Sequence, residues 1–191
     1  MNCCEKSKYA EFNIHSVEVW IASRDFMANF LMITATSGTN LELAERFAGA
    51  ARDKGHEAEV VDLAEMELPM FTMARSGDPE QAADVSELTQ QMIDADAWVV
   101  VAPEYNGSVP PTLNNALAWL SRDWKSFRDM CTGKPVGLAT HSGGGGAHVI
   151  VAMRLQFSFL GADVMGRALT SGRNKEANPE TIDAMIDNLA P

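Results

Sequence analysis

Three short segments of the chain concentrate residue types that bind ligands. The first, residues 35–40, reads Ala-Thr-Ser-Gly-Thr-Asn and offers hydroxyl groups, one glycine and backbone N–H groups where a helix is expected to begin. Such a turn favours a phosphate, because unpaired N–H groups and the helix dipole attract an anion without any lysine. The segment lacks the Walker pattern of ATP sites and the three glycines of a dinucleotide fingerprint. A plain helix cap made by its Ser and Thr side chains is the alternative interpretation.

The second segment, residues 103–111, reads Pro-Glu-Tyr-Asn-Gly-Ser-Val-Pro-Pro. Tyr105 has a ring that can pack on a planar ligand, Asn106 can donate and accept hydrogen bonds, and Gly107 lets the backbone approach closely. For Glu104, a purely local role in anchoring the turn stays open beside a role in binding. This mixture of an aromatic ring, a carboxylate and an amide indicates that the segment binds a ligand rather than only connecting a strand to a helix.

The third segment, residues 141–146, is His-Ser followed by four glycines directly before a predicted helix. Glycine loses more conformational freedom on folding than any other residue, so four in a row need a reason. A flat ligand lying against bare backbone would supply that reason. The alternative is a flexible linker, although the segment lies between a strand and a helix rather than between domains.

Other chemistries have weaker support in the sequence. His141 and His148 lack paired carboxylates at ligand spacing, so no metal site is expected. No Gly-x-Ser-x-Gly elbow follows a strand, which argues against a serine hydrolase. Cys3, Cys4 and Cys131 form neither a disulfide framework nor a metal motif, so a reducing cytoplasm is expected and Cys131 is given no role.

The elements around these segments alternate between strand and helix. Short apolar runs bounded by turn residues predict five buried strands, at Phe30–Ile33, Glu57–Leu63, Ala97–Ala102, Pro135–Thr140 and Ala162–Leu169. Amphipathic patterns and end signals predict the helices, at Leu41–Lys54, Pro79–Asp94, Thr112–Arg122 and Ala147–Leu160, with a last helix from Pro179.

Three helix-end signals are specific enough to be checked. Thr39 and Glu42 are spaced as a capping box, Asp78 is placed to cap the second helix, and Gly161 is placed as a left-handed stop for the fourth.

This alternation predicts the doubly wound α/β class: a five-stranded parallel sheet with right-handed crossovers and helices on both faces. Ligands of such sheets bind beyond the carboxyl ends of the strands. The three segments follow the first, third and fourth strands, so we expect them to meet at one rim.

The charge and hydropathy of the chain limit the classes of partner that it is expected to bind. Fifteen Lys plus Arg against 26 Asp plus Glu leave a formal net charge of −11, which repels nucleic acid and anionic membranes. No apolar run approaches the roughly 18–20 residues of a membrane span, and the length suits one soluble domain. Residues 1–26 have no signal-peptide pattern. We expect the domain to span residues 27–191, with Met27 as the natural start or with residues 1–26 as a genuine extension.

The second segment and the residues directly after it resemble a known family. Pro-Glu-Tyr-Asn-Gly-Ser-Val-Pro at 103–110, followed by Leu-Asn-Asn-Ala-Leu-Ala-Trp-Leu-Ser-Arg at 113–122, is similar to the motif of the NAD(P)H-dependent FMN reductases, which have a flavodoxin-like fold. His141-Ser142-Gly143-Gly144, Arg154-Leu155 and Leu160-Gly161 extend the resemblance, which covers about residues 28 to 190.

The resemblance implies an FMN oxidoreductase that takes electrons from NADPH or NADH and passes them to a small acceptor such as free flavin or a quinone. A flavodoxin-type electron carrier is one alternative, supported by the short first loop and the acidic balance. A flavin-free binding or structural protein that keeps the fold without the chemistry is the other. By resemblance, the first loop holds the FMN phosphate, the second lines the ribityl chain and the ring, and the third contacts the polar edge of the ring. The cofactor-binding residues so indicated are Thr36, Ser37, Gly38, Thr39, Asn40, Pro103, Glu104, Tyr105, Asn106, Gly107, Ser108, His141, Ser142, Gly143 and Gly144.

Two departures from the family pattern concern the first loop and one helix. The first loop has neither the length nor the arginine of the family's Gly-Ser-x-Arg, and Asn114 and Ala118 stand where Lys and Asp are usual. The family also implies a homodimer or homotetramer. A subunit contact formed by the region from Leu113 to Trp124 is one interpretation of the large apolar side chains there, and plain core packing is the other. These side chains are Leu117, Trp119, Leu120 and Trp124.

Overall fold

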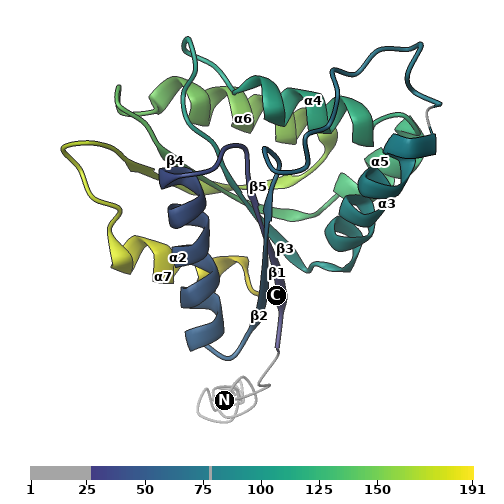
Figure 1. Ribbon diagram of the computed structural model, residues 1–191. Coiled ribbons are helices and arrows are strands. Elements are labelled where there is room, and N and C mark those ends of the chain that lie inside the picture. Colours follow the sequence, from purple (N-terminus) through teal and green to yellow (C-terminus); the bar gives the residue numbers. More distant parts are fainter. Residues whose placement is uncertain (1–26, 78) are drawn as a thin grey trace, which may run out of the picture.

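The computed structural model describes the backbone of residues 27–77 and 79–191, and the side chains of all of these except 79–84. The expected N-terminal extension and the cap at Asp78 lie outside the described residues. Within them, the chain alternates between strands and helices as predicted, and the order of the elements is shown in Figure 1.

All five predicted strands are present and parallel. They are β1 (Asn29–Thr34), β2 (Glu57–Asp62), β3 (Ala97–Val101), β4 (Pro135–His141) and β5 (Asp163–Ser171). They pair in the order β2-β1-β3-β4-β5. This is a doubly wound order, in which the direction of strand addition across the sheet reverses between β1 and β3. The predicted fold class is confirmed.

In the part of the chain that the structure describes, six helices cover the two faces of the sheet. They are α2 (Thr39–Asp53), α3 (Pro79–Asp94), α4 (Pro111–Leu120), α5 (Trp124–Cys131), α6 (Ala147–Leu160) and α7 (Pro179–Leu189). Helices α2 and α7 lie on one face, and the other four lie on the opposite face (Figure 1). None of these helices is long and apolar enough to cross a membrane.

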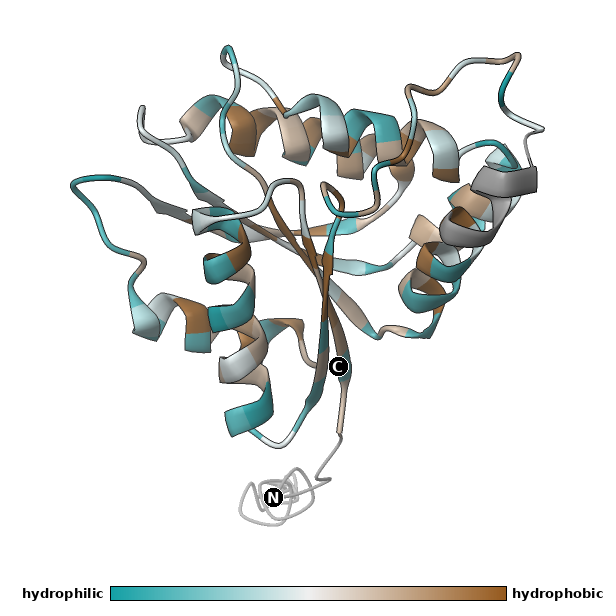
Figure 2. Ribbon diagram, in the orientation of Figure 1, coloured by the Kyte–Doolittle hydropathy of each residue, from teal (hydrophilic) through white to brown (hydrophobic). Residues whose placement is uncertain are grey.

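Each face of the sheet carries its own hydrophobic core, because successive side chains of a strand point to opposite faces. On β1, Phe30 and Met32 pack toward α2 and α7, whereas Leu31 and Ile33 pack toward α3, α4 and α6. Figure 2 shows the resulting band of apolar residues along the central strands, with polar residues on the outer sides of α2 and α3.

The sequence patterns missed one helix and misplaced one cap. Helix α5 was not predicted, since it has only eight residues; Asp123 caps it by accepting from the backbone N–H of Ser126. The capping box at Thr39 was wrong: Gly38 occupies the N-cap position with no side-chain cap, and Thr39 already belongs to the helix. Gly161 does end α6 in the left-handed conformation, as predicted.

The predicted contact region between Leu113 and Trp124 is largely core. Leu117, Trp119 and Leu120 are buried within the chain, and the indole N–H of Trp119 donates to the carbonyl of Pro69. Only Trp124 remains half exposed, at 50%. Core packing, rather than contact with another chain, therefore explains three of the four side chains.

Candidate functional site

The three predicted loops meet at the carboxyl rim of the sheet. The Asn40 side chain joins the first loop to the third, since its Oδ1 accepts from the backbone N–H of His141 at 2.9 Å and its Nδ2 donates to the His141 carbonyl at 3.1 Å. The backbone N–H of Glu104 joins the second loop to the third by donating to the Ser142 hydroxyl at 2.7 Å. The predicted convergence of the three loops is confirmed.

The first loop leaves backbone donors unused. Among the described residues, no protein acceptor is found for the N–H groups from Thr36 through Leu41, and Ser37, Gly38 and Thr39 are exposed. The loop itself is held in place by α4, because the Thr112 hydroxyl donates to the Ala35 carbonyl. A row of fixed, unpaired N–H groups at the start of α2 is suited to an anion.

Two carboxylates stand beside this row. The Ser37 hydroxyl donates to Asp62 at 2.6 Å and lies 3.5 Å from Glu65. Asp62 ends β2, the strand next to β1, and it also accepts from the backbone N–H of Ala64. An anion in the loop would therefore compete with Asp62 for the Ser37 hydroxyl.

The second loop is a tight hairpin. Tyr105 and Ser108 exchange two backbone hydrogen bonds of 3.0 Å, and Asn106 and Gly107 between them have φ values of 51° and 73°. Positive φ at both central positions is the pattern of a type I′ turn, which Asn-Gly favours. Asn106 and Gly107 are thus explained by the turn, which presents the half-exposed Tyr105 ring at the rim.

The four glycines of the third loop have different environments. Gly145 and Gly146 have φ values of 91° and 71°, and a Cβ on Gly146 would overlap the Thr140 side chain. Gly143 and Gly144 have no such constraint: a Cβ on either would meet no other atom within 4 Å. The fold accounts for the second pair of glycines but not for the first, so bare backbone at 143 and 144 fits a ligand that occupies this space.

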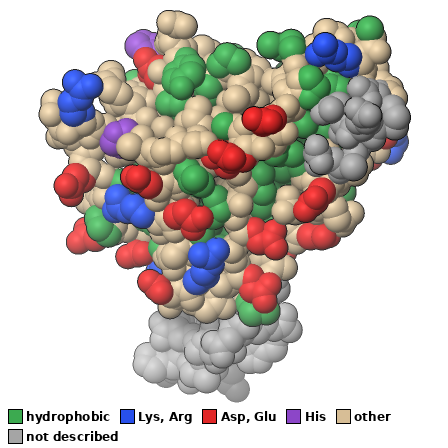
Figure 3. Space-filling view, viewed as in Figure 1, with side chains coloured by type: hydrophobic (Ala, Val, Ile, Leu, Met, Phe, Trp, Pro, Cys, Tyr) green, Lys and Arg blue, Asp and Glu red, His purple; other side chains and the backbone are tan. Residues whose placement is uncertain are grey.

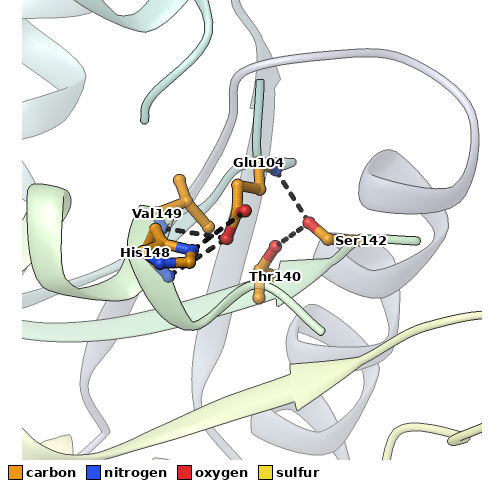
Figure 4. A network of polar contacts seen from close by, with 5 residues as sticks. All are labelled: Glu104, Thr140, Ser142, His148 and Val149. Atoms are coloured by element: carbon orange, nitrogen blue, oxygen red, sulfur yellow. Dashed lines mark hydrogen bonds and ion pairs between the residues drawn. The ribbon is translucent and has the colours of Figure 1, made fainter. Parts of the chain in front are cut away.

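Glu104 clamps the start of α6 against the second loop (Figure 4). Its carboxylate accepts from the backbone N–H groups of His148 at 3.0 Å and Val149 at 3.4 Å, and lies 3.2 Å from the His148 ring. Burial alone would raise the pKa of this carboxyl, but these hydrogen bonds outweigh it and hold the pKa below its usual value. The local anchoring role left open for Glu104 is the one its contacts support.

The Ser142 side chain also faces inward. Its hydroxyl lies 2.7 Å from the Thr140 hydroxyl, accepts from Glu104 and is almost fully buried. Ser142 and Asn40 therefore hold the loops together with their side chains, and their own polar groups are already engaged within the protein.

A pocket of about 500 Å³ opens beside the third loop, between the start of α2 and the segment after β5. Its lining includes Thr39, Arg46, His141, Ser171 and Arg173. This pocket lies at the carboxyl rim, on the side of the third loop that faces α2. By contrast, a pocket of about 170 Å³ at the opposite end of the sheet has Glu57, Glu59 and Asp94 in its lining, and these carboxylates disfavour an anion there.

The described residues offer little basis for metal or thiol chemistry. Among them, no group of three or more His, Cys, Asp or Glu side chains is arranged to hold a metal ion. Cys131 is fully buried, and burial raises the pKa of its thiol to about 11. Because the thiolate is the reactive form, this cysteine is unsuited to redox chemistry.

The sequence patterns missed several residues that build the rim. Thr112 supports the first loop, Thr140 supports the Ser142 hydroxyl, and Ser171 donates to the Thr140 carbonyl. Asp62, Thr140 and Ser171 share one signal that was available: each is a polar residue at or next to the carboxyl end of a strand.

Comparisons with known proteins agree on one group. A family model described as NADPH-dependent FMN reductase matches residues 29–176. A quinone reductase of Escherichia coli is 38% identical over 104 residues, which are 53% of each chain. An FMN-dependent NADH:quinone oxidoreductase of Alkalilimnicola ehrlichii is 31% identical over 137 residues, or 59% of this chain and 68% of that protein. The match thus spans about half the length of the first of these relatives.

Solved structures share the fold at low identity. The flavoenzyme NAD(P)H:(acceptor) oxidoreductase of Paracoccus denitrificans superimposes with a TM-score of 0.70 at 19% identity, covering 86% of this chain and 96% of that one. A flavodoxin from the domain Archaea gives a TM-score of 0.60 at 11% identity, covering 85% and 96%. At these identities the likeness concerns the flavodoxin-like fold alone.

Proposed function

The chain belongs to the NADPH-dependent FMN reductase family, and from this premise we propose that it is a NAD(P)H-dependent flavin oxidoreductase. In this proposal, the protein binds FMN and passes electrons from the nicotinamide nucleotide to a small acceptor such as free flavin or a quinone. The names of the curated relatives, a quinone reductase and FMN-dependent NADH:quinone oxidoreductases, support a quinone-like acceptor.

One observation carries the proposal: unused backbone donors and bare glycine backbone lie together at one rim. The N–H groups from Thr36 to Asn40 would hold the phosphate, because they have no other acceptor among the described residues and the α2 dipole favours a negative charge there. The Ser37 hydroxyl would turn from Asp62 toward the phosphate. No lysine or arginine is needed for this anion site.

The other two loops would hold the ring system. Residues Pro103 to Ser108 would line the ribityl chain and one side of the ring, with Tyr105 as the aromatic contact. His141 to Gly144 would face the polar edge of the ring, where the N–H groups of Gly143 and Gly144 have no acceptor within the described chain. Donors fixed in that position would stabilise negative charge on the ring edge, as fixed dipoles do in other active sites.

FMN, when bound, would supply the hydride and electron transfer itself. The chain would contribute position, exclusion of water from one side of the ring, and the electrostatics of its backbone donors. No side chain is assigned as a general base, which agrees with the scarcity of free titratable groups in the three loops.

The proposal includes three further expectations. Residues 27–191 form the FMN-binding domain, and residues 1–26 are an extension of it. The cysteine pattern favours the cytoplasm, and the family resemblance favours a homodimer or homotetramer. A flavodoxin-type carrier is less well supported, since the matching family model and the named curated relatives are reductases.

The test is a titration followed by an activity assay. Purified apoprotein should bind FMN and quench its fluorescence, and riboflavin, which lacks the phosphate, should bind at least about tenfold more weakly. The holoprotein should then consume NADPH or NADH steadily when a benzoquinone is supplied. A protein that binds no FMN would refute the site, and one that binds FMN without oxidising either nucleotide would favour the carrier.

A further inference from the structure

Two carboxylates lie beside the unpaired backbone N–H groups of residues 36–41, which we call the cradle. The Ser37 hydroxyl donates to the Oδ2 atom of Asp62 at 2.6 Å and lies 3.5 Å from the Oε1 atom of Glu65. Asp62 is half-buried, and Glu65 is exposed. Like charges repel, so both carboxylates oppose the anion that the N–H groups and the dipole of α2 attract.

No basic side chain offsets these two carboxylates. Residues 34–45, which include the cradle, and residues 57–74, which include both carboxylates, contain no Lys or Arg. The first basic residue of α2, Arg46, donates to the Ala177 carbonyl, and neither carboxylate forms an ion pair among the described residues. Figure 3 shows acidic side chains spread across the face of the molecule that carries α2 and β2. The cradle must therefore attract a phosphate against uncompensated negative charge.

The Asp62 carboxylate is held close to the cradle. Its other oxygen, Oδ1, accepts from the backbone N–H of Ala64 at 2.9 Å. Asp62 is paired in register with Thr34, the last residue of β1, and the first loop starts directly after Thr34. The Thr34 hydroxyl donates to the Thr36 carbonyl at 2.9 Å, which fixes the start of the loop. The carboxylate and the cradle are therefore anchored to the same pair of strands.

Asp62 and a bound phosphate would compete for one proton. A serine hydroxyl has a single proton to donate, and Ser37 donates it to Asp62. A phosphate within hydrogen-bond reach of the same hydroxyl would bring its oxygens to within about 5 Å of the carboxylate. Over such a distance, two charges near a protein surface interact strongly enough to change an affinity several-fold. Phosphate binding therefore removes one hydrogen bond from Asp62 and meets its charge.

We propose that Asp62, assisted by Glu65, lowers the affinity of the cradle for the phosphate of FMN, so that FMN exchanges with the solution instead of staying bound. The inference rests on the proposed function, because it concerns the same FMN site. Its basis is specific to this chain: the first loop lacks the arginine of the family's Gly-Ser-x-Arg, so nothing compensates for the charge of Asp62. Asp62 is then a residue that limits the affinity of the site without binding the ligand.

Two other roles for Asp62 predict different results. If Asp62 accepted a hydrogen bond from the ribityl chain, removal of its charge would weaken the binding of FMN and of riboflavin alike. If a divalent cation joined the two carboxylates to the phosphate, removal of the charge would weaken FMN binding whenever that cation is present. Repulsion instead predicts that FMN binds more tightly once the charge is removed.

The test is a fluorescence titration of wild type and Asp62→Asn with FMN and with riboflavin, in the presence of EDTA. Asn keeps the shape of Asp and an oxygen for the Ala64 N–H, but it has no charge and releases the Ser37 hydroxyl. We expect the dissociation constant for FMN to fall about tenfold. The dissociation constant for riboflavin, which has no phosphate, should stay within about twofold.

Glu57→Gln is the matched control. It makes the same change in net charge at an exposed carboxylate on the first residue of β2, whereas Asp62 is the last. The two ends of the strand are roughly 16 Å apart, which is beyond the range of unscreened interaction at physiological salt. The affinity of the control for FMN should stay within about twofold of wild type. In a Ser37→Ala background, Asp62→Asn should tighten FMN binding less, because no hydroxyl remains to compete for.

Two further measurements keep the proposal testable. FMN should leave Asp62→Asn about tenfold more slowly than wild type, since affinity differences at one site arise mostly from the dissociation rate. Glu65→Gln changes an exposed side chain, so it covers the case in which Asp62→Asn is unstable, and it should lower the dissociation constant for FMN about threefold. Far-UV circular dichroism checks that each variant is folded.

The outcomes separate this inference from the proposed function. The inference fails if the folded variants bind FMN no more tightly than wild type, if Glu57→Gln gains as much as Asp62→Asn, or if riboflavin gains as much as FMN. Wild-type binding of FMN that tightens when Mg²⁺ replaces EDTA would assign the carboxylates to a cation and would also overturn it. The proposed function is judged by wild type alone, through its preference for FMN over riboflavin and its oxidation of a nicotinamide nucleotide.

Discussion

The backbone N–H of Glu104 donates to the Ser142 hydroxyl over 2.7 Å, although the two residues are 38 positions apart in the chain. Thr140 lies on the other side of the same hydroxyl at 2.7 Å. Ser142 thereby joins the hairpin after β3 to the glycine loop after β4. Among the described residues the two loops share no backbone–backbone hydrogen bond, so this bond and the contacts of the Glu104 carboxylate with the start of α6 hold them together.

Replacing Ser142 should loosen this joint. In Ser142→Ala the backbone N–H of Glu104 loses its acceptor, which costs about 1–3 kcal/mol of unfolding free energy. Urea unfolding of the apoprotein measures this loss. Ser108→Ala is the control, since the exposed Ser108 hydroxyl makes no hydrogen bond in the described residues, and its effect should be close to zero. Equal losses for the two variants would contradict the role assigned to Ser142.

The Glu104 clamp should depend on pH. Because its hydrogen bonds hold the pKa of Glu104 below the usual value, its contribution to stability is present above the unfolded-state pKa of about 4.3 and is lost as the pH falls through the lower, folded-state value. Wild type should therefore be more stable than Glu104→Gln at neutral pH, and the difference should shrink in acid. Urea unfolding of both proteins between neutral and acidic pH measures the difference. A difference that does not change with pH would show that the charge is unimportant.

Substitutions should divide the glycines of the third loop into two classes, one that affects FMN binding and one that affects stability. Gly144→Val should leave the apoprotein about as stable as wild type but weaken FMN binding at least about tenfold, because its side chain enters free space at the rim. Gly146→Ala should instead destabilise the apoprotein by roughly 1–3 kcal/mol, because it forces positive φ and an overlap with Thr140. Unfolding curves and FMN titrations separate the two effects. Unchanged FMN affinity in a folded Gly144→Val protein would place the ring elsewhere.

Cys131 should be inert in the folded protein. With its thiol fully buried and its pKa raised to about 11, alkylation at mildly alkaline pH should leave it unmodified until denaturant is added. Peptide mass spectrometry identifies the modified cysteine directly and keeps Cys131 apart from Cys3 and Cys4. Labelling of Cys131 at the same rate with and without denaturant would contradict the burial.

The sequence by itself determined the architecture and the place of the rim. Continuous apolar runs such as that of β1 can be buried only between two layers of helices, and strand-helix alternation then forces parallel strands whose carboxyl ends meet. These are local patterns, so they can be read along the chain. The convergence of residues 35–40, 103–111 and 141–146 is a consequence of them.

Only the tertiary structure decided what individual side chains do there. Asn40, Glu104 and Ser142 have the polar groups of ligand-binding residues, yet each uses them on a partner 38 to 101 positions away. Trp119 and Phe159 are equally apolar in the sequence, but the first fills the core and the second is exposed on α6. Burial and hydrogen-bond partners depend on which distant segments pack together, and no local pattern specifies that.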